Sequence, residues 1–363
     1  MKKKFTLIVL AGLFIVPAYN QTPATDPHWN KTWEDEFLNL NNWYLGEGPH
    51  KKEDIYVFTK RPENVYLSNG RLVLQALRKD TVYNGKLYHY TSGGVANYTP
   101  GLHFGYIESK MKLPYGKGFW PAFWTWTGAI NASNAGEIDI FEMTKYPSST
   151  TMGTNLHMYY CNDSLCDLSQ YKPCNDCKGT LYKQECPNVN PAVLCYGQDV
   201  TIPSYANIDR VYGLEWTPTK FIWYVDGVAV RNFPNPGIID PVWIYLNLAL
   251  IHWWPDAPDN TTPFPAQMEI DYVRIYKLKC DGGVINNCSY NFNTYNNKVK
   301  QSITIGGNGC SNSLSPGDHI TMRATDFIEI KGDFYAPVKA ELYLDVNPIA
   351  EPCTKVISER EKE

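Results

Sequence analysis

The stretch Gly136-Glu137-Ile138-Asp139-Ile140-Phe141-Glu142 places carboxylates among isoleucines and a phenylalanine. β-Branched and aromatic neighbours favour a β-strand, in which successive side chains point to opposite faces. Glu137 and Asp139 would then share one face, while Ile138 and Ile140 point into a core. An ionised group in such a strand is costly unless its face is hydrated or functional. The stretch therefore predicts a site on the face of a β-sheet.

Glu142 decides how many carboxylates that face carries. Regular alternation would put it opposite Glu137, but a one-residue β-bulge between Asp139 and Glu142 would return it to the acidic face, and the apolar alternation breaks at Ile140-Phe141. The carboxyl groups of Glu137 and Glu142 could then approach to about 5 Å, with Asp139 between them. Since neighbouring carboxylates do not all ionise readily, we expect one to hold a proton near neutral pH. On these residues alone, a hydrated acidic face or a calcium site is the alternative.

The chain from Trp33 to Tyr276 is a series of short alternating runs separated by Gly, Pro and Asn, as in Val65-Tyr66-Leu67-Ser68-Asn69-Gly70-Arg71-Leu72-Val73-Leu74. Regular short strands with turn residues between them predict an all-β, antiparallel sandwich. A stretch of this length is large enough to bury a core by itself.

Six motifs in chain order resemble glycoside hydrolase family 16. They are the acidic stretch 136–142 and Gly105-Tyr106-Ile107-Glu108-Ser109-Lys110-Met111-Lys112-Leu113-Pro114, Phe119-Trp120-Pro121-Ala122-Phe123-Trp124, Leu214-Glu215-Trp216-Thr217-Pro218, Trp223-Tyr224-Val225-Asp226-Gly227 and Met268-Glu269-Ile270-Asp271-Tyr272-Val273-Arg274-Ile275-Tyr276. The resemblance implies a β-jelly-roll sandwich with a concave glycan cleft and retaining hydrolysis of β-linked polysaccharides. It implies that Glu137 is the nucleophile, Glu142 the general acid/base and Asp139 the carboxylate that tunes them.

The resemblance also supplies candidates for substrate binding. Trp120 and Trp124, four residues apart, would share a strand face, and the resemblance places that strand across the cleft, so both are candidate sugar platforms; ordinary sandwich core is the equal alternative. His157 matches a cleft-lining histidine that could orient Glu137 by a hydrogen bond. Leu246-Asn247-Leu248-Ala249 and Trp254-Pro255 match a cleft segment, which makes Asn247 and Trp254 candidates.

Three positions depart from the family pattern and leave the substrate open. Ile251 and His252 replace glycines usual in β-1,3-glucanases, and Lys110 stands where an arginine is usual. We expect an endo-acting enzyme on β-1,3-glucan such as laminarin or on mixed-linkage β-1,3-1,4-glucan. A marine galactan hydrolase of the agarase or carrageenase type, or a non-catalytic glycan-binding jelly roll, is the alternative.

Hydrolysis of this type implies no cofactor for catalysis. Glu36, Gly70 and Asp271 match positions where many relatives hold a structural calcium through carboxylates and a backbone carbonyl, and hard oxygen ligands suit that ion. The alternative is that the two carboxylates only cap turns.

The N-terminus predicts export. Three lysines follow Met1, residues 5–16 are almost wholly apolar, and small and polar residues follow. This pattern is typical of a secretory signal peptide over residues 1–20 that is too short to span a bilayer. No later stretch could cross a membrane. We therefore expect a cleaved signal and a secreted, extracellular or cell-surface protein.

The cysteines fit an oxidising compartment, since all 10 lie after residue 160. Six of them fall in 161–195, which predicts a disulfide-bonded insertion within a catalytic domain over residues 21–279. Zinc at Cys174 and Cys177 is the alternative. Residues 281–363 predict a small C-terminal β module with a charged tail, in which Cys288, Cys310 and Cys353 are available for bridges.

The net charge of the chain bears on which classes of molecule it binds. The formal net charge is -4, which argues against nucleic acid as a partner. A polysaccharide substrate and a monomeric protein are the expectation.

Overall fold

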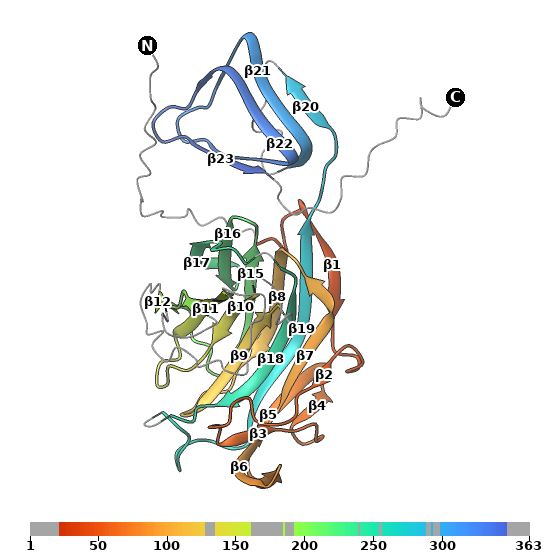
Figure 1. Cartoon of the computed structure of the whole chain (residues 1–363), viewed down its shortest axis with the longest axis vertical. Coiled ribbons are helices and arrows are strands. Elements are labelled where there is room, and N and C mark those ends of the chain that lie inside the picture. The colour runs from red at the N-terminus through yellow and green to blue at the C-terminus, as the bar shows by residue number, and fades with distance from the viewer. Residues whose placement is uncertain are drawn as a thin grey trace, which may run out of the picture.

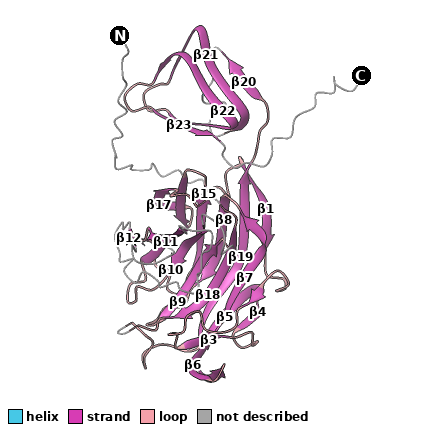
Figure 2. Cartoon of the chain, viewed as in Figure 1, coloured by secondary structure: helices cyan, strands magenta, loops and turns pink. Residues whose placement is uncertain are grey.

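The computed structural model describes residues 22–127, 135–160, 184–185, 192–238, 240–253, 256–287, 292 and 298–346. Every element named within them is a β-strand (Figures 1 and 2). Two large sheets, of ten and nine strands, enclose one hydrophobic core, and a four-stranded sheet follows them in the chain. The predicted all-β jelly-roll sandwich is confirmed.

The ten-stranded sheet has the order β17-β16-β15-β8-β19-β5-β6-β3, with β1 beside β19 and β4 beside β5. All its pairings are antiparallel except that of β3 with β6. Its strands are β1 (Trp29–Asp35), β3 (Tyr56–Phe58), β4 (Val65–Ser68), β5 (Arg71–Tyr83), β6 (Lys86–Ser92), β8 (Gly105–Lys112), β15 (Asp209–Trp216), β16 (Lys220–Val225), β17 (Val228–Pro234) and β19 (Ala266–Leu278).

The nine-stranded sheet has the order β12-β13-β11-β10-β9-β18-β7-β2, with β14 beside β11. Its acidic strand, β10, lies between β9 and β11. Its strands are β2 (Tyr44–Leu45), β7 (Gly94–Leu102), β9 (Phe119–Trp126), β10 (Ala135–Glu142), β11 (Thr151–Tyr160), β12 (Gln184–Glu185), β13 (Ala192–Cys195), β14 (Gln198–Thr201) and β18 (Val242–Leu250).

Alternation along the strands gives the nine-stranded sheet two different faces. In β18, Ile244 and Leu246 are fully buried in the core, whereas Trp243 and Tyr245, which alternate with them, are partly exposed. Each buried side chain of this size contributes about 1.5–3 kcal/mol to folding. The side chains that alternate with the core line the opposite face, which we call the open face of this sheet.

The C-terminal strands form a second, smaller unit (Figure 1). They are β20 (Val284–Asn287), β21 (Val299–Ser313), β22 (His319–Tyr335) and β23 (Glu341–Val346). Each pairs in parallel with the next, and together they enclose a cluster that includes Ile303, Ile305 and Met322. Cys280 and Cys310 each take part in a disulfide. The parallel pairing was not predicted, because it joins segments that are far apart in the sequence.

This C-terminal unit contacts the sandwich. The hydroxyl of Tyr343 lies 3.1 Å from Thr219 Oγ1, and Lys220 lies over the Tyr343 ring at 5.1 Å. Val299 packs in a cluster with Trp29 and Tyr276 of the sandwich. The unit is therefore packed on the sandwich and is not only tethered to it.

Several predictions lie outside the described residues. They are the signal peptide, the zinc alternative at Cys174 and Cys177, Cys288, Cys353, the charged tail and most of the insertion, of which only β12 and β13 are described. In the described part of the chain, no helix has the length and apolar character needed to cross a membrane.

Candidate active site

The acidic strand contains the predicted bulge. The pairing of β10 with β11 shifts register between Asp139 and Glu142, and its pairing with β9 shifts between Asp139 and Phe141. Ile140 and Phe141, although adjacent, are both buried in the core. Glu142 thereby leaves the core side and pairs with Ala122, which is two register positions along β9 from Trp124, the partner of Asp139, and so faces the same way. The bulge prediction is confirmed.

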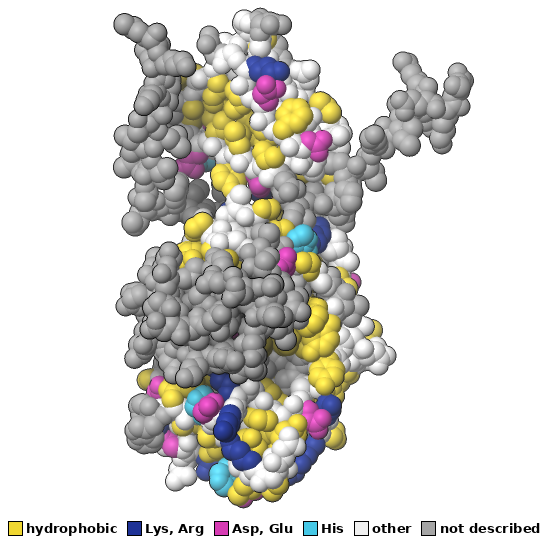
Figure 3. Space-filling model, viewed as in Figure 1, with side chains coloured by type: hydrophobic (Ala, Val, Ile, Leu, Met, Phe, Trp, Pro, Cys, Tyr) yellow, Lys and Arg dark blue, Asp and Glu magenta, His cyan; other side chains and the backbone are white. Residues whose placement is uncertain are grey.

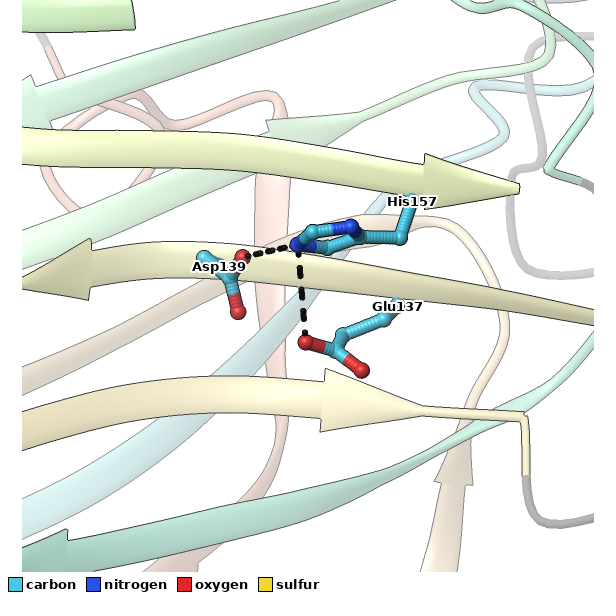
Figure 4. A group of neighbouring side chains, drawn as sticks. All are labelled: Glu137, Asp139 and His157. Carbon is cyan, nitrogen blue, oxygen red and sulfur yellow. Dashed lines mark ion pairs between the residues drawn. The ribbon is translucent and has the colours of Figure 1, made fainter. Parts of the chain in front are cut away.

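His157 of β11 lies beside Glu137 and Asp139, which we call the acidic pair (Figure 4). Its Nε2 is 3.3 Å from Asp139 Oδ2 and 3.7 Å from Glu137 Oε1. Glu137 and His157 are register partners on neighbouring strands, which fixes this approach. On its other side, His157 Nδ1 is 3.0 Å from Cys195 Sγ. The imidazole is therefore held between the acidic pair and β13.

Burial makes this cluster electrostatically unusual. Burial first, and then the charge of Glu137, raise the pKa of Asp139 to about 6. Burial and the charge of Asp139 raise the pKa of Glu142 to about 7. Burial lowers the pKa of His157, but the charges of Glu137, Asp139 and Glu142 outweigh it and raise that pKa to about 10. Near neutral pH, this arrangement favours an imidazolium ion and a proton on Glu142.

Glu142 is oriented by one of the predicted platforms. Trp120 Nε1 donates a hydrogen bond of 2.9 Å to Glu142 Oε1. The Trp120 ring also meets Trp253 edge to face at 5.2 Å. Trp120 therefore lies on the open face next to the carboxyl group and is partly exposed.

Trp124 and Asn247 are joined to each other. Trp124 Nε1 donates to Asn247 Oδ1 at 2.7 Å, and the Trp124 ring stacks on Tyr245 with centroids 4.3 Å apart and planes 18° apart. One face of Trp124 is therefore covered by Tyr245, which limits this ring as a sugar platform. Trp254 lies outside the described residues.

A buried arginine of the ten-stranded sheet lies behind the acidic strand. Arg231 of β17 donates to Thr154 Oγ1 at 2.9 Å and to the Tyr196 carbonyl at 2.7 Å. Its guanidinium lies 4.4 Å from the Trp223 ring centroid, and Trp223 Nε1 donates to the Asp139 carbonyl at 3.0 Å. Burial lowers the pKa of Arg231 to about 10, and the charge of Asp139 opposes that shift. A positive charge therefore lies behind the carboxylates.

The departures from the family pattern have defined contacts. Ile251 is buried, and its N–H bonds to the Gly118 carbonyl at 2.9 Å. His252 Nδ1 lies 3.3 Å from the buried Asp54 carboxylate. This pair ties the segment after β18 to the segment before β3, near Trp253 and the Glu142 end of the site.

The residues expected to hold calcium do not fit that ion. Glu36 Oε1 accepts hydrogen bonds of 3.0 and 2.7 Å from the Arg274 guanidinium, and Asp271 Oδ2 is 2.7 Å from Lys110 Nζ. Gly70 lies in the turn between β4 and β5 with φ 71°. Because side-chain cations already neutralise both carboxylates, we assign no calcium site here. The two acids form ion pairs and do not merely cap turns.

Among the described residues, the one group able to offer three side-chain ligands to a metal ion is Glu137, Asp139 and His157, whose ligand atoms lie within 4.8 Å of one another. An imidazolium has no lone pair for a metal, however, and the raised pKa of His157 favours that form. Ion pairing explains the cluster better than metal binding does.

Sequence reasoning missed several residues of this region. Cys195 and Arg231 reach the cluster only through pairings distant in sequence, so no local pattern marks them. Trp243 and Tyr245 did carry a signal, because they alternate with the apolar residues of the run that contains Asn247.

Comparisons with known proteins agree with this geometry. The family model described as "XgeA-like, catalytic GH16 domain" matches residues 97–221. A beta-glucanase of Rhodothermus marinus is 28% identical over 304 residues, which cover 75% of this chain and 93% of the relative. Glucan endo-1,3-beta-glucosidase A1 of Niallia circulans is 27% identical over 70% of this chain, but the match spans only 39% of that longer protein.

Solved structures give the same result. The laminarinase catalytic domain of Thermotoga maritima superposes with a TM-score of 0.53 and 26% identity, covering 68% of this chain and 98% of that domain. The endo-beta-1,3-glucanase of Pyrococcus furiosus superposes with a TM-score of 0.53 and 28% identity, covering 69% and 95%.

Proposed function

We propose that this chain, which belongs to glycoside hydrolase family 16 and is a glycoside hydrolase, cleaves β-1,3-glucan or mixed-linkage β-1,3-1,4-glucan within the polymer and retains the anomeric configuration. The bulge in β10 is the observation that carries the proposal, because it returns Glu142 from the core side of the strand to the open face that carries Glu137 and Asp139. Retaining hydrolysis needs a carboxylate and a protonated carboxyl group on one face, so that both groups can act on the same sugar.

In the first step, Glu142 acts as the acid. Its raised pKa of about 7 keeps a proton available near neutral pH, and that proton passes to the glycosidic oxygen as the bond to the anomeric carbon breaks. The Glu137 carboxylate attacks that carbon from the other side and forms a covalent glycosyl-enzyme. The leaving chain departs with the proton.

In the second step, the ionised Glu142 acts as the base. It takes a proton from a water molecule, whose oxygen attacks the anomeric carbon and releases Glu137. Two inversions give net retention. The chemistry uses two carboxyl groups and water, and therefore needs no cofactor.

Asp139 and His157 act through these two groups. The negative charge of Asp139 raises the pKa of Glu142, which preserves the acid. The His157 cation lies within 3.7 Å of the Glu137 carboxylate and favours its ionised form. The assignment thus gives opposite protonation states to the two catalytic carboxyl groups.

The stereochemistry of the first products tests this proposal. Proton NMR of purified enzyme acting on laminarin should show the β-anomer before mutarotation sets in. Initial release of the α-anomer would require an inverting reaction with a wider carboxyl separation, and would overturn the nucleophile assignment.

A galactan is the second candidate substrate, favoured by the Ile251-His252 departure. An assay of new reducing ends distinguishes the glucan from the galactan proposal. Its substrates are laminarin, mixed-linkage glucan, agarose and carrageenan. The glucan proposal expects at least tenfold higher kcat/KM on a glucan than on either galactan, a discrimination of about 1.4 kcal/mol. No new reducing ends from any member would favour a glycan-binding role.

We further propose that the enzyme acts outside the cell as a monomer. The basic and apolar N-terminal pattern and the 10 cysteines support export. N-terminal sequencing of the secreted protein should find a start near residue 21, and sedimentation should give the mass of one chain. An intact Met1 on protein recovered from the medium would contradict cleavage.

A further inference from the structure

Two loops that are far apart in the sequence meet beside the Glu142 end of the site. Asp54, in the segment before β3, is only 3% exposed. Its Oδ1 lies 3.3 Å from Nδ1 of His252, in the segment after β18. This distance suits an ion pair with a protonated His252, although the contact does not have the geometry of a hydrogen bond. We call Asp54 and His252 the loop pair.

The aspartate of the loop pair is held in place by its own loop. Asp54 Oδ2 accepts a hydrogen bond of 2.6 Å from the Lys51 N–H, and the Asp54 N–H donates to the Lys51 carbonyl at 3.1 Å. Lys86 Nζ on β6 donates to the Asp54 carbonyl at 3.2 Å. Because backbone and side chain are both bonded, the carboxylate has a fixed position from which it can hold a partner.

The histidine of the loop pair leads to the proposed catalytic acid. Its ring meets that of Trp253 edge to face at 5.2 Å. Trp253 in turn meets Trp120 edge to face at 5.2 Å, and Trp120 Nε1 donates to Glu142 Oε1 at 2.9 Å. The position of His252 is therefore passed to the carboxyl group through two indole rings in contact.

The loop before β3 lies over the same end of the open face. The His50 ring is 6.1 Å from the ring of Trp124, which belongs to that face. Figure 3 shows Lys and Arg side chains gathered over the region of β3 and β6. Lys51, next to His50, brings a positive charge from this basic region toward the site.

The charges around Glu142 show what the two loops contribute. Burial and the charge of Asp139 raise the pKa of Glu142. Three groups oppose them and lower that pKa, namely the His157 charge, the Trp120 hydrogen bond and the Lys51 charge. Asp199 of β14, two strands away, is paired with Lys145 at 3.0 Å. Each loop joined by the loop pair therefore carries or contacts one of the three groups.

We propose that Asp54 and His252 are positioning residues, which join the two loops and so hold Trp120 and Lys51 in place beside Glu142. This inference rests on the proposed function and deepens it, since it adds residues that act on the acid through other groups. A glycine at position 252, which is usual in β-1,3-glucanases, has no side chain to make the pair.

The pH dependence of kcat/KM on laminarin tests this role. Asp54→Asn keeps an acceptor for the Lys51 N–H but removes the charge, and His252→Gln removes the imidazole. Each change should loosen Trp120 and Lys51, so the pKa of Glu142 should rise and the alkaline limb should move up by about half a pH unit or more. Lost orientation should lower kcat at its optimum about tenfold, with KM within about twofold.

The sign of the shift separates positioning from the direct effect of a removed charge. Loss of the Asp54 charge would by itself lower the pKa of Glu142, whereas loss of a His252 charge would raise it. Positioning expects a rise in both variants and a similar rise in the double variant, because both changes break one contact. Limbs that moved in opposite directions would overturn the proposal. A lower Tm with an unmoved limb would also overturn it, since the pair would then be only structural.

A second pair of the same residue types provides the matched control. His89 Nδ1 on β6 lies 2.8 Å from Asp80 Oδ1 on β5, and the two side chains are 65% and 70% exposed. Asp80→Asn and His89→Gln should leave kcat and the alkaline limb unchanged. An equal movement of the limb in these variants would contradict positioning, because it would reflect net charge alone.

A titration without substrate separates failure of this inference from failure of the proposed function. Carbon NMR of the side-chain carboxyl groups, with the Glu142 signal identified by its loss in Glu142→Gln, should show a midpoint of about 7 in the wild type. The midpoint should rise in Asp54→Asn and in His252→Gln, and this would support positioning even if no polysaccharide were cleaved. An unmoved midpoint would overturn positioning even if the wild type cleaved glucan with retention.

Discussion

Two acidic clusters on the two sheets of this enzyme have opposite electrostatic environments. On the nine-stranded sheet, Glu137 and Asp139 share one imidazole, Glu142 lies on the same face, and the pKa values of Asp139 and Glu142 are raised. On the outward face of the ten-stranded sheet, a second cluster pairs three acidic with three basic side chains, and we call it the paired cluster. Its contacts are Arg71 with Asp209, Lys110 with Asp271 and Lys112 with Glu269, each at 2.7 Å.

The difference indicates that the environment of a carboxylate, and not its presence in a strand, decides whether it holds a proton near neutral pH. In the paired cluster, the Arg71 hydrogen bonds lower the pKa of Asp209, so its proton is lost well below neutral pH. In the proposed catalytic cluster of Glu137, Asp139 and Glu142, burial and mutual repulsion keep protons on carboxyl groups. Only the cluster that contains Glu142 holds a carboxylic acid near neutral pH, as an acid catalyst of glycoside cleavage must.

The largest expected effect is on catalysis. Glu137→Gln and Glu142→Gln should each lower kcat on laminarin by about 10³-fold or more, since each removes a group that acts in the transition state. Glu269→Gln in the paired cluster should leave kcat/KM within about twofold, as expected of a surface substitution. Circular dichroism and laminarin binding should remain unchanged in all three.

A Glu137→Gln variant that kept a tenth of the wild-type rate would break the comparison. So would a Glu269→Gln variant that lost activity while folded. Azide added to Glu137→Ala offers a further check, because a small nucleophile should restore turnover and yield the α-glycosyl azide if Glu137 is the nucleophile.

The next effect concerns pH. Activity should fall as pH rises through about 7, the pKa of Glu142, because only the protonated form is an acid. Burial is the first cause of this raised pKa and the Asp139 charge the second. Asp139→Asn removes the second cause, so the pKa should fall and the alkaline limb of kcat/KM should move to lower pH. We expect a loss of about 10- to 100-fold at pH 7.

An alkaline limb unmoved in Asp139→Asn would show that Asp139 does not tune Glu142. Asp209→Asn is the control in the paired cluster, where the same change of charge should leave the pH profile as it is. Both profiles should be measured at one ionic strength, since salt screens the more exposed pairs.

Local sequence predicted the parts of this site that depend on local pattern. The break in alternation at Ile140-Phe141 predicted the bulge, and the family resemblance together with strand spacing placed His157 on the face of Glu137. The expected calcium ligands Glu36 and Asp271 instead form ion pairs, because the cations that meet them come from strands distant in sequence. Arg274 lies on β19, and Lys110 on β8.

Other features were beyond local pattern for the same reason. Arg231 reaches the acidic strand through the core from the other sheet. The C-terminal strands have the alternation of a small β module, but alternation alone does not distinguish their parallel pairing from hairpins. What decides each case is which distant strands become neighbours.

The catalytic cluster should also cost stability. The folded pKa of Glu142 is raised to about 7 from an ordinary 4.5, so folding favours its protonated form. The stabilisation from this preference is present below the ordinary pKa and is lost as pH rises through about 7. Glu142→Gln, which keeps an acceptor for Trp120 Nε1, should therefore raise the free energy of unfolding by about 1–3 kcal/mol at pH 8.

At pH 4 the gain should vanish, because wild-type Glu142 is then protonated in both states. Urea unfolding at the two pH values measures the difference. A gain that was equal at pH 4 and pH 8 would indicate improved packing or solvation and not relief of a buried charge.

The paired cluster should show the opposite sign and the smallest effect. Arg71 lowers the pKa of Asp209, so its contribution to stability is present above the ordinary pKa and is lost as pH falls through the lowered one. Because the Asp209 side chain is 36% exposed, solvent screens the pair, and Asp209→Asn should cost about 0.5 kcal/mol or less at pH 7. Urea unfolding in low and high salt should show the cost shrinking as salt rises. A stabilising Asp209→Asn would mean that these acids also repel one another, and the contrast between the two sheets would then be one of degree.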